Sequence, residues 1–198
     1  MTERDILIIG GGAAGFFTAI NAAEMNPGAR ISILERGNEV LNKVKVSGGG
    51  RCNVTHAEFD PRQLAKNYPR GEKELRGPFH AFMTGDTIAW FESRGVELKT
   101  EEDGRMFPVS NSSQTIIDCF LEEIDRLGIQ LLKKQPVQDI SQLNGKWKIT
   151  TKTTEFLAQK VVIATGSNPK IWRLLEKLGH QIIPPVPSLF TFNVKDGR

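Results

Sequence analysis

The chain has 198 residues, of which 39% are apolar and 25% charged, a composition typical of a globular protein with one large domain. Its formal charge of +3, without a dense Lys/Arg run, gives no argument from charge for binding nucleic acid. The sequence contains no apolar run of about 18 residues, which argues against a transmembrane helix. The first predicted strand begins too early to leave room for a signal peptide.

A short apolar strand over residues 6–9 leads into a glycine turn and then into a predicted helix over residues 16–24. The turn has the spacing Gly10-x-Gly12-x-x-Gly15. In a dinucleotide-binding βαβ unit the first glycine permits the tight turn, the second lets the backbone approach a pyrophosphate, and the third lets helix and strand pack closely. The helix N-terminus then offers unpaired N–H groups to the phosphates.

A second predicted strand, residues 30–35, ends on Glu35, about twenty residues after Gly15. At this position a carboxylate accepts hydrogen bonds from the ribose 2′-OH of an adenine dinucleotide, and it disfavours a 2′-phosphate. The sequence therefore favours FAD or NAD over NADP at the turn. The alternative is a glycine-rich turn in some other α/β unit.

Residues 36–43 form a predicted loop or short helix, and the run Ser47-Gly-Gly-Gly-Arg-Cys-Asn53 follows them. Three successive glycines lose much conformational entropy when they become ordered. Such a run is useful where several N–H groups converge on an anion, or where the backbone lies against a flat ligand. The polar and reactive neighbours favour a ligand-lining loop over the alternative of a flexible loop.

The two cysteines, Cys52 and Cys119, are predicted to be reduced thiols of a cytoplasmic protein, because no secretion signal precedes them. Cys119 falls within a predicted helix over residues 115–127, capped by Ser112 or Ser113 and ended by Gly128, and is expected to be a core residue. No metal site is predicted.

The other predicted elements follow in chain order. Short helices, the last over residues 86–94, form an insertion at about 57–95, and a strand covers 96–100. Gly104-Arg-Met-Phe-Pro108 is predicted to be a turn, and residues 129–132 a strand. A small antiparallel β-meander is expected at about 137–158, with a hairpin at Asn144-Gly145.

Residues 160–166 form a predicted strand that ends in Ala-Thr-Gly at the ligand-binding edge of a sheet, and a helix covers 171–178. His180 follows that helix and receives no role. The fold class is thus α/β, a Rossmann-like dinucleotide-binding domain with a parallel sheet and a small antiparallel β-meander. We expect this domain to cover residues 1–186, and residues 187–198 to begin a second domain. The chain is then the N-terminal part of a longer protein or, alternatively, an unusually short relative of such proteins.

Several motifs in this order resemble the BaiN-like family of NAD(P)/FAD-dependent oxidoreductases. They are the glycine turn with Glu35, Lys43-x-x-x-Ser-Gly-Gly-Gly-Arg-Cys-Asn-x-Thr55, Gly104-Arg-x-Phe-Pro108, Val161-Val-Ile-Ala-Thr-Gly166 and Gly179-His-x-Ile-x-Pro-Pro-Val-Pro-Ser188. The resemblance implies a Rossmann-like FAD-binding domain, a flavoprotein of about twice this length, and FAD as cofactor. Two departures are Ser167, where relatives commonly have a second glycine, and His56, where they often have Asn.

The resemblance also implies which residues contact FAD. Those around the pyrophosphate would be Gly10, Gly12, Ala13, Ala14 and Gly15, and those at the adenosine would be Glu35, Arg36 and the backbone of Val137. Residues running toward the isoalloxazine would be Lys43, Ser47, Gly48, Gly49, Gly50, Arg51, Cys52 and Asn53, and those closing over the cofactor would be Ala164, Thr165 and Gly166.

The implied function is an oxidoreductase that passes a hydride from NAD(P)H through FAD to an electron-poor C=C bond of a small-molecule substrate. Cys52 would donate the proton as general acid, and Arg51 would stabilise the oxyanion; the alternative for Cys52 is a purely structural residue. Two other functions remain open. One is a non-catalytic FAD-binding module for redox sensing or partner binding, and the other is an RNA-modifying flavoprotein that reduces uridine. A membrane partner is not expected.

Overall fold

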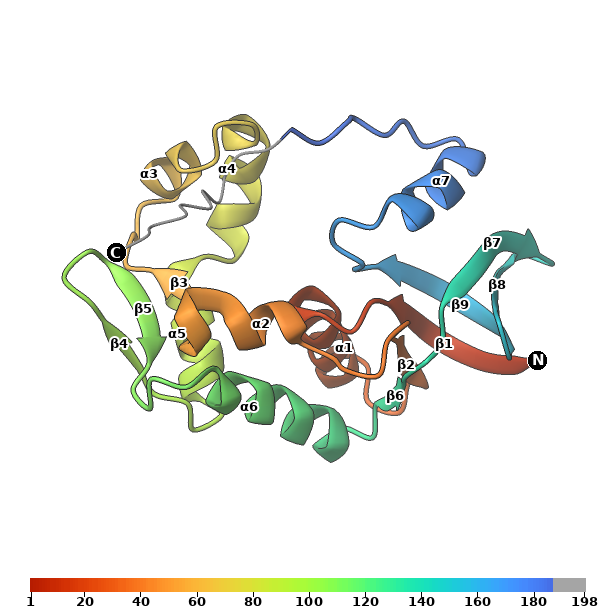
Figure 1. Ribbon diagram of the computed structural model, residues 1–198, viewed down its shortest axis with the longest axis horizontal. Helices are drawn as coiled ribbons and strands as arrows, with labels where there is room; N and C mark the ends of the chain where they lie inside the picture. The colour runs from red at the N-terminus through yellow and green to blue at the C-terminus, as the bar shows by residue number, and fades with distance from the viewer. Residues whose placement is uncertain (187–198) are drawn as a thin grey trace, which may run out of the picture. The chain divides into compact units, whose positions relative to one another are not determined.

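The computed structural model describes residues 1–186, and they divide into two compact units, Met1–Gly166 and a unit that begins at Ser167. The first unit contains a six-stranded sheet in the order β6-β2-β1-β9-β8-β7 (Figure 1). Strands β6, β2, β1 and β9 are parallel to one another, and β8 and β7 continue the sheet antiparallel. Their bounds are β1 Thr2–Ile9, β2 Ile31–Leu34, β6 Gln130–Leu132, β7 Val137–Leu143, β8 Lys146–Thr151 and β9 Glu155–Ile163.

Apolar residues place β1 at the centre of the parallel sheet. Leu7 and Ile8 are completely buried, and β1 has a hydrogen-bonded neighbour on each side. Helices α1 (Ala13–Met25) and α6 (Ser113–Arg126) pack against the sheet through a shared buried cluster, in which the Phe16 and Phe120 ring centroids lie 5.9 Å apart. The predicted cap of α6 is confirmed at Ser112, whose hydroxyl accepts a hydrogen bond from Gln114 N.

The segment between β2 and α6 carries the remaining elements of this unit. Helix α2 (Asn42–Val46) and the 3₁₀ turn η1 (Ser47–Gly50) come first, then helices α3 (Pro61–Lys66), α4 (Glu72–Ala81) and α5 (Thr84–Glu92). Strands β3 (Thr55–His56), β5 (Arg105–Pro108) and β4 (Leu98–Thr100) form a second sheet in that order, which Figure 1 shows beside α5. Trp90 and Phe91 anchor α5 in the buried cluster.

Two predictions of secondary structure are wrong. Residues 104–108 are not a turn: Gly104 ends a tight turn with φ of +82°, and β5 begins directly after it. β5 is stabilised by pairing with β3 and β4, which a local pattern does not reveal. The last part of the expected meander and the strand expected at 160–166 form one continuous strand, β9, which pairs with β1 between Phe156 and Ile163.

The second unit contains helix α7 (Pro169–Lys177), which begins two residues earlier than predicted. Asn168 caps it, with its side-chain oxygen accepting from Lys170 N at 3.2 Å, and Pro169 occupies the first helical position. The second domain predicted to begin at residue 187 lies outside the described residues, and the domain boundaries stay a prediction.

Candidate dinucleotide-binding site

The glycine turn (residues 10–15) lies where β1 ends and α1 begins, at the carboxyl end of the parallel strands. Gly10 has φ of +121°, and a Cβ atom there would lie 2.4 Å from the carbonyl oxygen of Ala164. A Cβ atom on Gly15 would lie only 1.9 Å from the Gly10 oxygen. Both positions therefore require glycine, one for contact with the end of β9 and the other for contact between helix and turn.

The N-terminus of α1 is open to a ligand. Gly12 is its N-cap, and among the described residues no side chain caps the helix and no acid lies in its first turn. A Cβ atom on Gly12 would meet no heavy atom within 4 Å, and Ala13 and Ala14 are exposed. An anion can thus reach the uncapped N–H groups and the positive end of the helix dipole.

Glu35 is fixed beside the turn by the backbone. Its Oε2 accepts from Gly11 N at 2.9 Å and its Oε1 from Gly37 N at 2.7 Å. Each carboxylate oxygen keeps further acceptor capacity for a ribose hydroxyl. Val137 begins β7 two residues after Gln135, whose N–H donates to the Glu35 backbone oxygen at 2.8 Å.

Gly11 was not among the predicted site residues, although it links three parts of this site. Besides binding Glu35, it accepts a hydrogen bond from Leu41 N at 2.8 Å, which anchors the start of α2. A Cβ atom on Gly11 would lie 2.9 Å from Val40 and 3.0 Å from Glu35. In the sequence, the sign that Gly11 is also constrained was its position between Gly10 and Gly12.

Lys43, on α2, brings a positive charge to the carboxyl end of the sheet. Its Nζ lies 3.5 Å from the position that a Cβ atom on Gly166 would occupy. Of the predicted site residues, Gly10 thus lies against Ala164 and Thr165. Gly166 and Lys43 lie beside them. Arg36 follows Glu35 with an exposed side chain.

The glycine loop (residues 47–53) has a backbone that ordinary residues adopt rarely. φ is +56° at Gly48, +69° at Gly49, +87° at Gly50 and +61° at Cys52. A Cβ atom on Gly49 would meet nothing within 4 Å, so its side is open. The loop is held by its own hydrogen bonds, among them Cys52 N to Ser47 O at 3.0 Å.

The side chains of Cys52 and Arg51 lie in different surroundings. Cys52 is 6% exposed within the hydrophobic cluster, and burial raises the pKa of its thiol, although a hydrogen bond with Ser47 opposes this shift. The guanidinium of Arg51 forms an ion pair with Glu101 and lies 3.9 Å from the centroid of the Phe107 ring. Asn53, at the end of the loop, is exposed.

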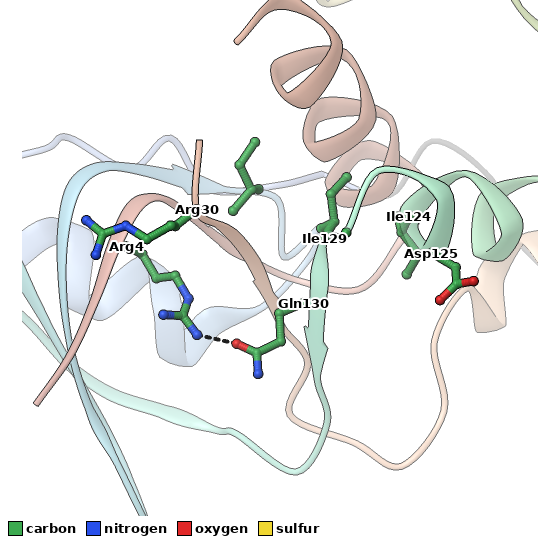
Figure 2. A pocket seen from close by; sticks show the side chains of 8 residues that line it. Arg4, Arg30, Ile124, Asp125, Ile129 and Gln130 are labelled. Atoms are coloured by element: carbon green, nitrogen blue, oxygen red, sulfur yellow. Dashed lines mark hydrogen bonds between the residues drawn. The ribbon is translucent and has the colours of Figure 1, made fainter. Parts of the chain in front are cut away.

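A shallow cavity of about 520 Å³ lies at the opposite end of the sheet, where β2 and β6 begin (Figure 2). Figure 2 shows Arg4 directed toward Gln130, and its Nε donates to Ser32 Oγ at 2.5 Å. Arg30 is paired with Asp5 at 3.0 Å. Arg4, Gln130 and Arg30 thus already have polar partners, and the glycine turn is the better candidate for a ligand site.

Within residues 1–186, His, Cys, Asp and Glu side chains form no group of three or more that is suited to a metal ion. No helix in that part of the chain combines the length and the apolar character needed to cross a bilayer.

Comparison with known proteins identifies the family. The model of the family described as "HI0933-like protein Rossmann domain" matches residues 4–188. The chain is 28% identical over 197 residues to a "3-dehydro-bile acid delta(4,6)-reductase" of Clostridium scindens, covering 95% of the chain and 47% of that protein. It is 25% identical over 202 residues to a "Ribosomal RNA dihydrouridine synthase" of Haemophilus influenzae, covering 96% and 49%. The chain thus spans about half the length of these curated relatives.

Solved structures show the same fold. THI4 of Thermovibrio ammonificans superposes with a TM-score of 0.61 at 17% identity, covering 90% of this chain and 64% of that one. The 3-ketosteroid-delta4-(5alpha)-dehydrogenase of Rhodococcus jostii superposes with a TM-score of 0.60 at 16% identity, covering 87% and 48%. The predicted Rossmann-like α/β fold is confirmed.

Proposed function

Because the chain belongs to the HI0933-like Rossmann-domain family, the BaiN-like flavoproteins, we propose that its protein is an FAD-dependent oxidoreductase. In this proposal, a hydride from NAD(P)H passes through FAD to an electron-poor C=C bond of a small molecule. The observation that supports it best is Glu35, whose carboxylate is held against Gly11 beside an uncapped helix N-terminus. There the Glu35 carboxylate would accept a hydrogen bond from a ribose hydroxyl, and the N–H groups at the start of α1 would donate to a pyrophosphate.

The residues present fit FAD. Gly12, Ala13 and Ala14 would receive the pyrophosphate, Glu35 the adenosine ribose, and Lys43 would bring a positive charge to the part of the site that leads toward the isoalloxazine. Bound FAD supplies the redox chemistry that connects NAD(P)H with the substrate. The chain supplies the position of the cofactor, and the glycine loop would line the way to its ring system.

The proposed roles of Arg51 and Cys52 concern the substrate after hydride addition. The substrate then carries an anion, which Arg51 would stabilise and which requires a proton. The raised pKa keeps the Cys52 thiol protonated and able to donate, while its burial equally fits a structural residue. Cys52→Ser decides between these: unchanged single-turnover reoxidation of the flavin by substrate would exclude the acid role.

A second candidate function is reduction of uridine in RNA. It is favoured by two relatives named "Ribosomal RNA dihydrouridine synthase", from Haemophilus influenzae and Escherichia coli. Uracil contains an electron-poor C=C bond, so the proposed chemistry is shared. Salt-dependent binding of RNA would separate this candidate from a small-molecule reductase.

The proposal is tested with the purified protein. Its visible spectrum shows whether FAD is bound, and anaerobic titration with NADH and with NADPH shows which of them reduces it. A protein without bound FAD, and without affinity for added FAD, contradicts the proposal. A protein that binds FAD yet stays oxidised with both nicotinamides is instead a non-catalytic FAD-binding module.

A further inference from the structure

The motif Gly104-Arg-Met-Phe-Pro108 has no role in the proposed function so far, yet the structure places it directly against the glycine loop. Phe107 is completely buried in β5. A Cβ atom on Gly48 would lie 2.8 Å from Phe107 Cε1, so the loop backbone touches the aromatic ring. The guanidinium of Arg51 lies over the same ring at 3.9 Å. Phe107 therefore supports the loop at two points.

The stem of the loop is attached to the same strand. Val54 N donates to Met106 O at 2.9 Å, and β3, which follows the loop, pairs antiparallel with β5. Glycine is favoured at the turn before β5, because φ is +82° at Gly104 and a Cβ atom there would lie 2.6 Å from the ring of His56. The loop and its exit strand are thus both held by one short strand, β5, which lies far from them in sequence.

Charged groups complete this arrangement. The Glu101 carboxylate accepts hydrogen bonds from both terminal nitrogens of Arg51. It also forms an ion pair with Arg105 at 3.6 Å. Asp103 binds only the other arginine, with Arg105 Nε donating to its Oδ2 at 2.6 Å. Glu101 thus both orients Arg51 and offsets its positive charge, whereas Asp103 belongs to the same hairpin without touching Arg51.

We propose that the β4–β5 hairpin is the positioning element of the flavin site, in which Phe107 holds the glycine loop and Glu101 fixes Arg51 and its charge. The part that concerns flavin rests on the proposed function. Phe107 and Glu101 are positioning residues, because they act through the loop and Arg51. Their substitution should therefore change the loop and the flavin environment, and not stability alone.

The first experiment needs no flavin. Hydrogen exchange is measured at the backbone amides of Arg51 and Cys52, which are bonded within the loop. We expect exchange about tenfold faster in Phe107→Leu and Glu101→Gln, as local opening becomes easier, and close to the parent rate in Asp103→Asn. Parent rates in both Phe107→Leu and Glu101→Gln would overturn the proposal.

The second experiment uses the FAD-loaded protein and sulfite, an anion whose addition to the flavin bleaches the visible band and is favoured by nearby positive charge. Glu101→Gln removes the carboxylate that offsets the charge of Arg51, so sulfite should bind about tenfold more tightly, the size of effect expected from one partly screened elementary charge. In Arg51→Met/Glu101→Gln this gain should disappear, and Asp103→Asn should show none. Equal sulfite affinity in the parent and Glu101→Gln would refute the charge role of Glu101.

The two experiments separate the two proposals. If the protein binds no FAD, the proposed function fails, while hydrogen exchange still decides whether the hairpin positions the glycine loop. If FAD binds and is reduced by a nicotinamide while exchange is unchanged in both variants, the proposed function stands and the positioning role fails.

Discussion

Two glycines of the glycine turn, three residues apart, constrain the molecule in different ways. A Cβ atom on Gly15 would overlap the Gly10 oxygen at 1.9 Å, whereas one on Gly12 would meet nothing within 4 Å. Gly12 also has φ of −96°, which any residue can adopt. Packing therefore requires Gly15, and space for a ligand is the remaining reason for Gly12.

Gly15→Ala should consequently destabilise the protein by about 3 kcal/mol or more, because backbone has to shift to admit the methyl group. Gly12→Ala should leave the free energy of unfolding within about 0.5 kcal/mol of the parent value and still weaken FAD binding about tenfold or more, as its methyl group meets the pyrophosphate. Urea unfolding and FAD titration measure the two effects. Normal FAD affinity in a folded Gly12→Ala would contradict the proposed location of the pyrophosphate.

Asp5 makes the stability of the sheet depend on pH. Hydrogen bonds from the Arg30 guanidinium and the Arg30 backbone N–H lower the pKa of Asp5 from 3.8 to about 2. A carboxyl with a lowered folded-state pKa stabilises the fold above its unfolded pKa, and this contribution is lost as the pH falls through the folded pKa. Asp5→Asn should thus be less stable than the parent at pH 7, and the difference should vanish between about pH 4 and pH 2.

Chemical unfolding at a series of pH values measures that difference. The control is Glu102→Gln, which removes an exposed carboxylate that forms no ion pair among the described residues. Its stability difference from the parent should stay small and constant over the same pH range. A difference for Asp5→Asn that persists unchanged at pH 2 would show that the ion pair is not its cause.

At the scale of elements, the β7–β8 hairpin depends on its turn. Asn144 has φ of +51° and Gly145 has φ of +75°, the combination that a two-residue hairpin with the right twist requires. Gly145→Ala should destabilise the protein by about 1 kcal/mol, since a Cβ atom is unfavourable at positive φ. Gly85→Ala in α5 should instead stabilise it by about 0.5 kcal/mol or more, because its site is open and helical. Thermal unfolding distinguishes the opposite signs.

Local elements were predictable because their cause is local. The glycine turn lies between an apolar strand and a helix, and Asn144-Gly145 lies between alternating strands, so neighbouring residues are enough to define both. β5 was predicted wrongly as a turn because its stability comes from β3 and β4. The contact of Phe107 with Gly48 joins residues far apart in sequence, and no periodicity or spacing in the sequence predicts it.

At the scale of the whole molecule, the candidate site is assembled from distant parts of the unit Met1–Gly166. The glycine turn follows the first strand, Lys43 comes from α2, and Ala164 follows β9 near the end of the unit. The β1–β9 pairing that joins these ends must form before the site exists. A ligand that binds only the assembled site therefore stabilises the entire unit against unfolding.

FAD at about one hundred times its dissociation constant should stabilise the protein by about 2.7 kcal/mol, which corresponds to a rise in Tm of about 5–10 °C. Because the glycine turn and Glu35 would bind the pyrophosphate and the adenosine ribose, ADP should raise Tm as well. FMN lacks both the adenosine and the second phosphate, and it should raise Tm much less. Gly12→Ala, which keeps the unliganded Tm, should reduce the responses to ADP and FAD together, by about half or more for binding that is tenfold weaker. An FMN response equal to that of FAD would move the ligand away from the turn and contradict the assignment of this site.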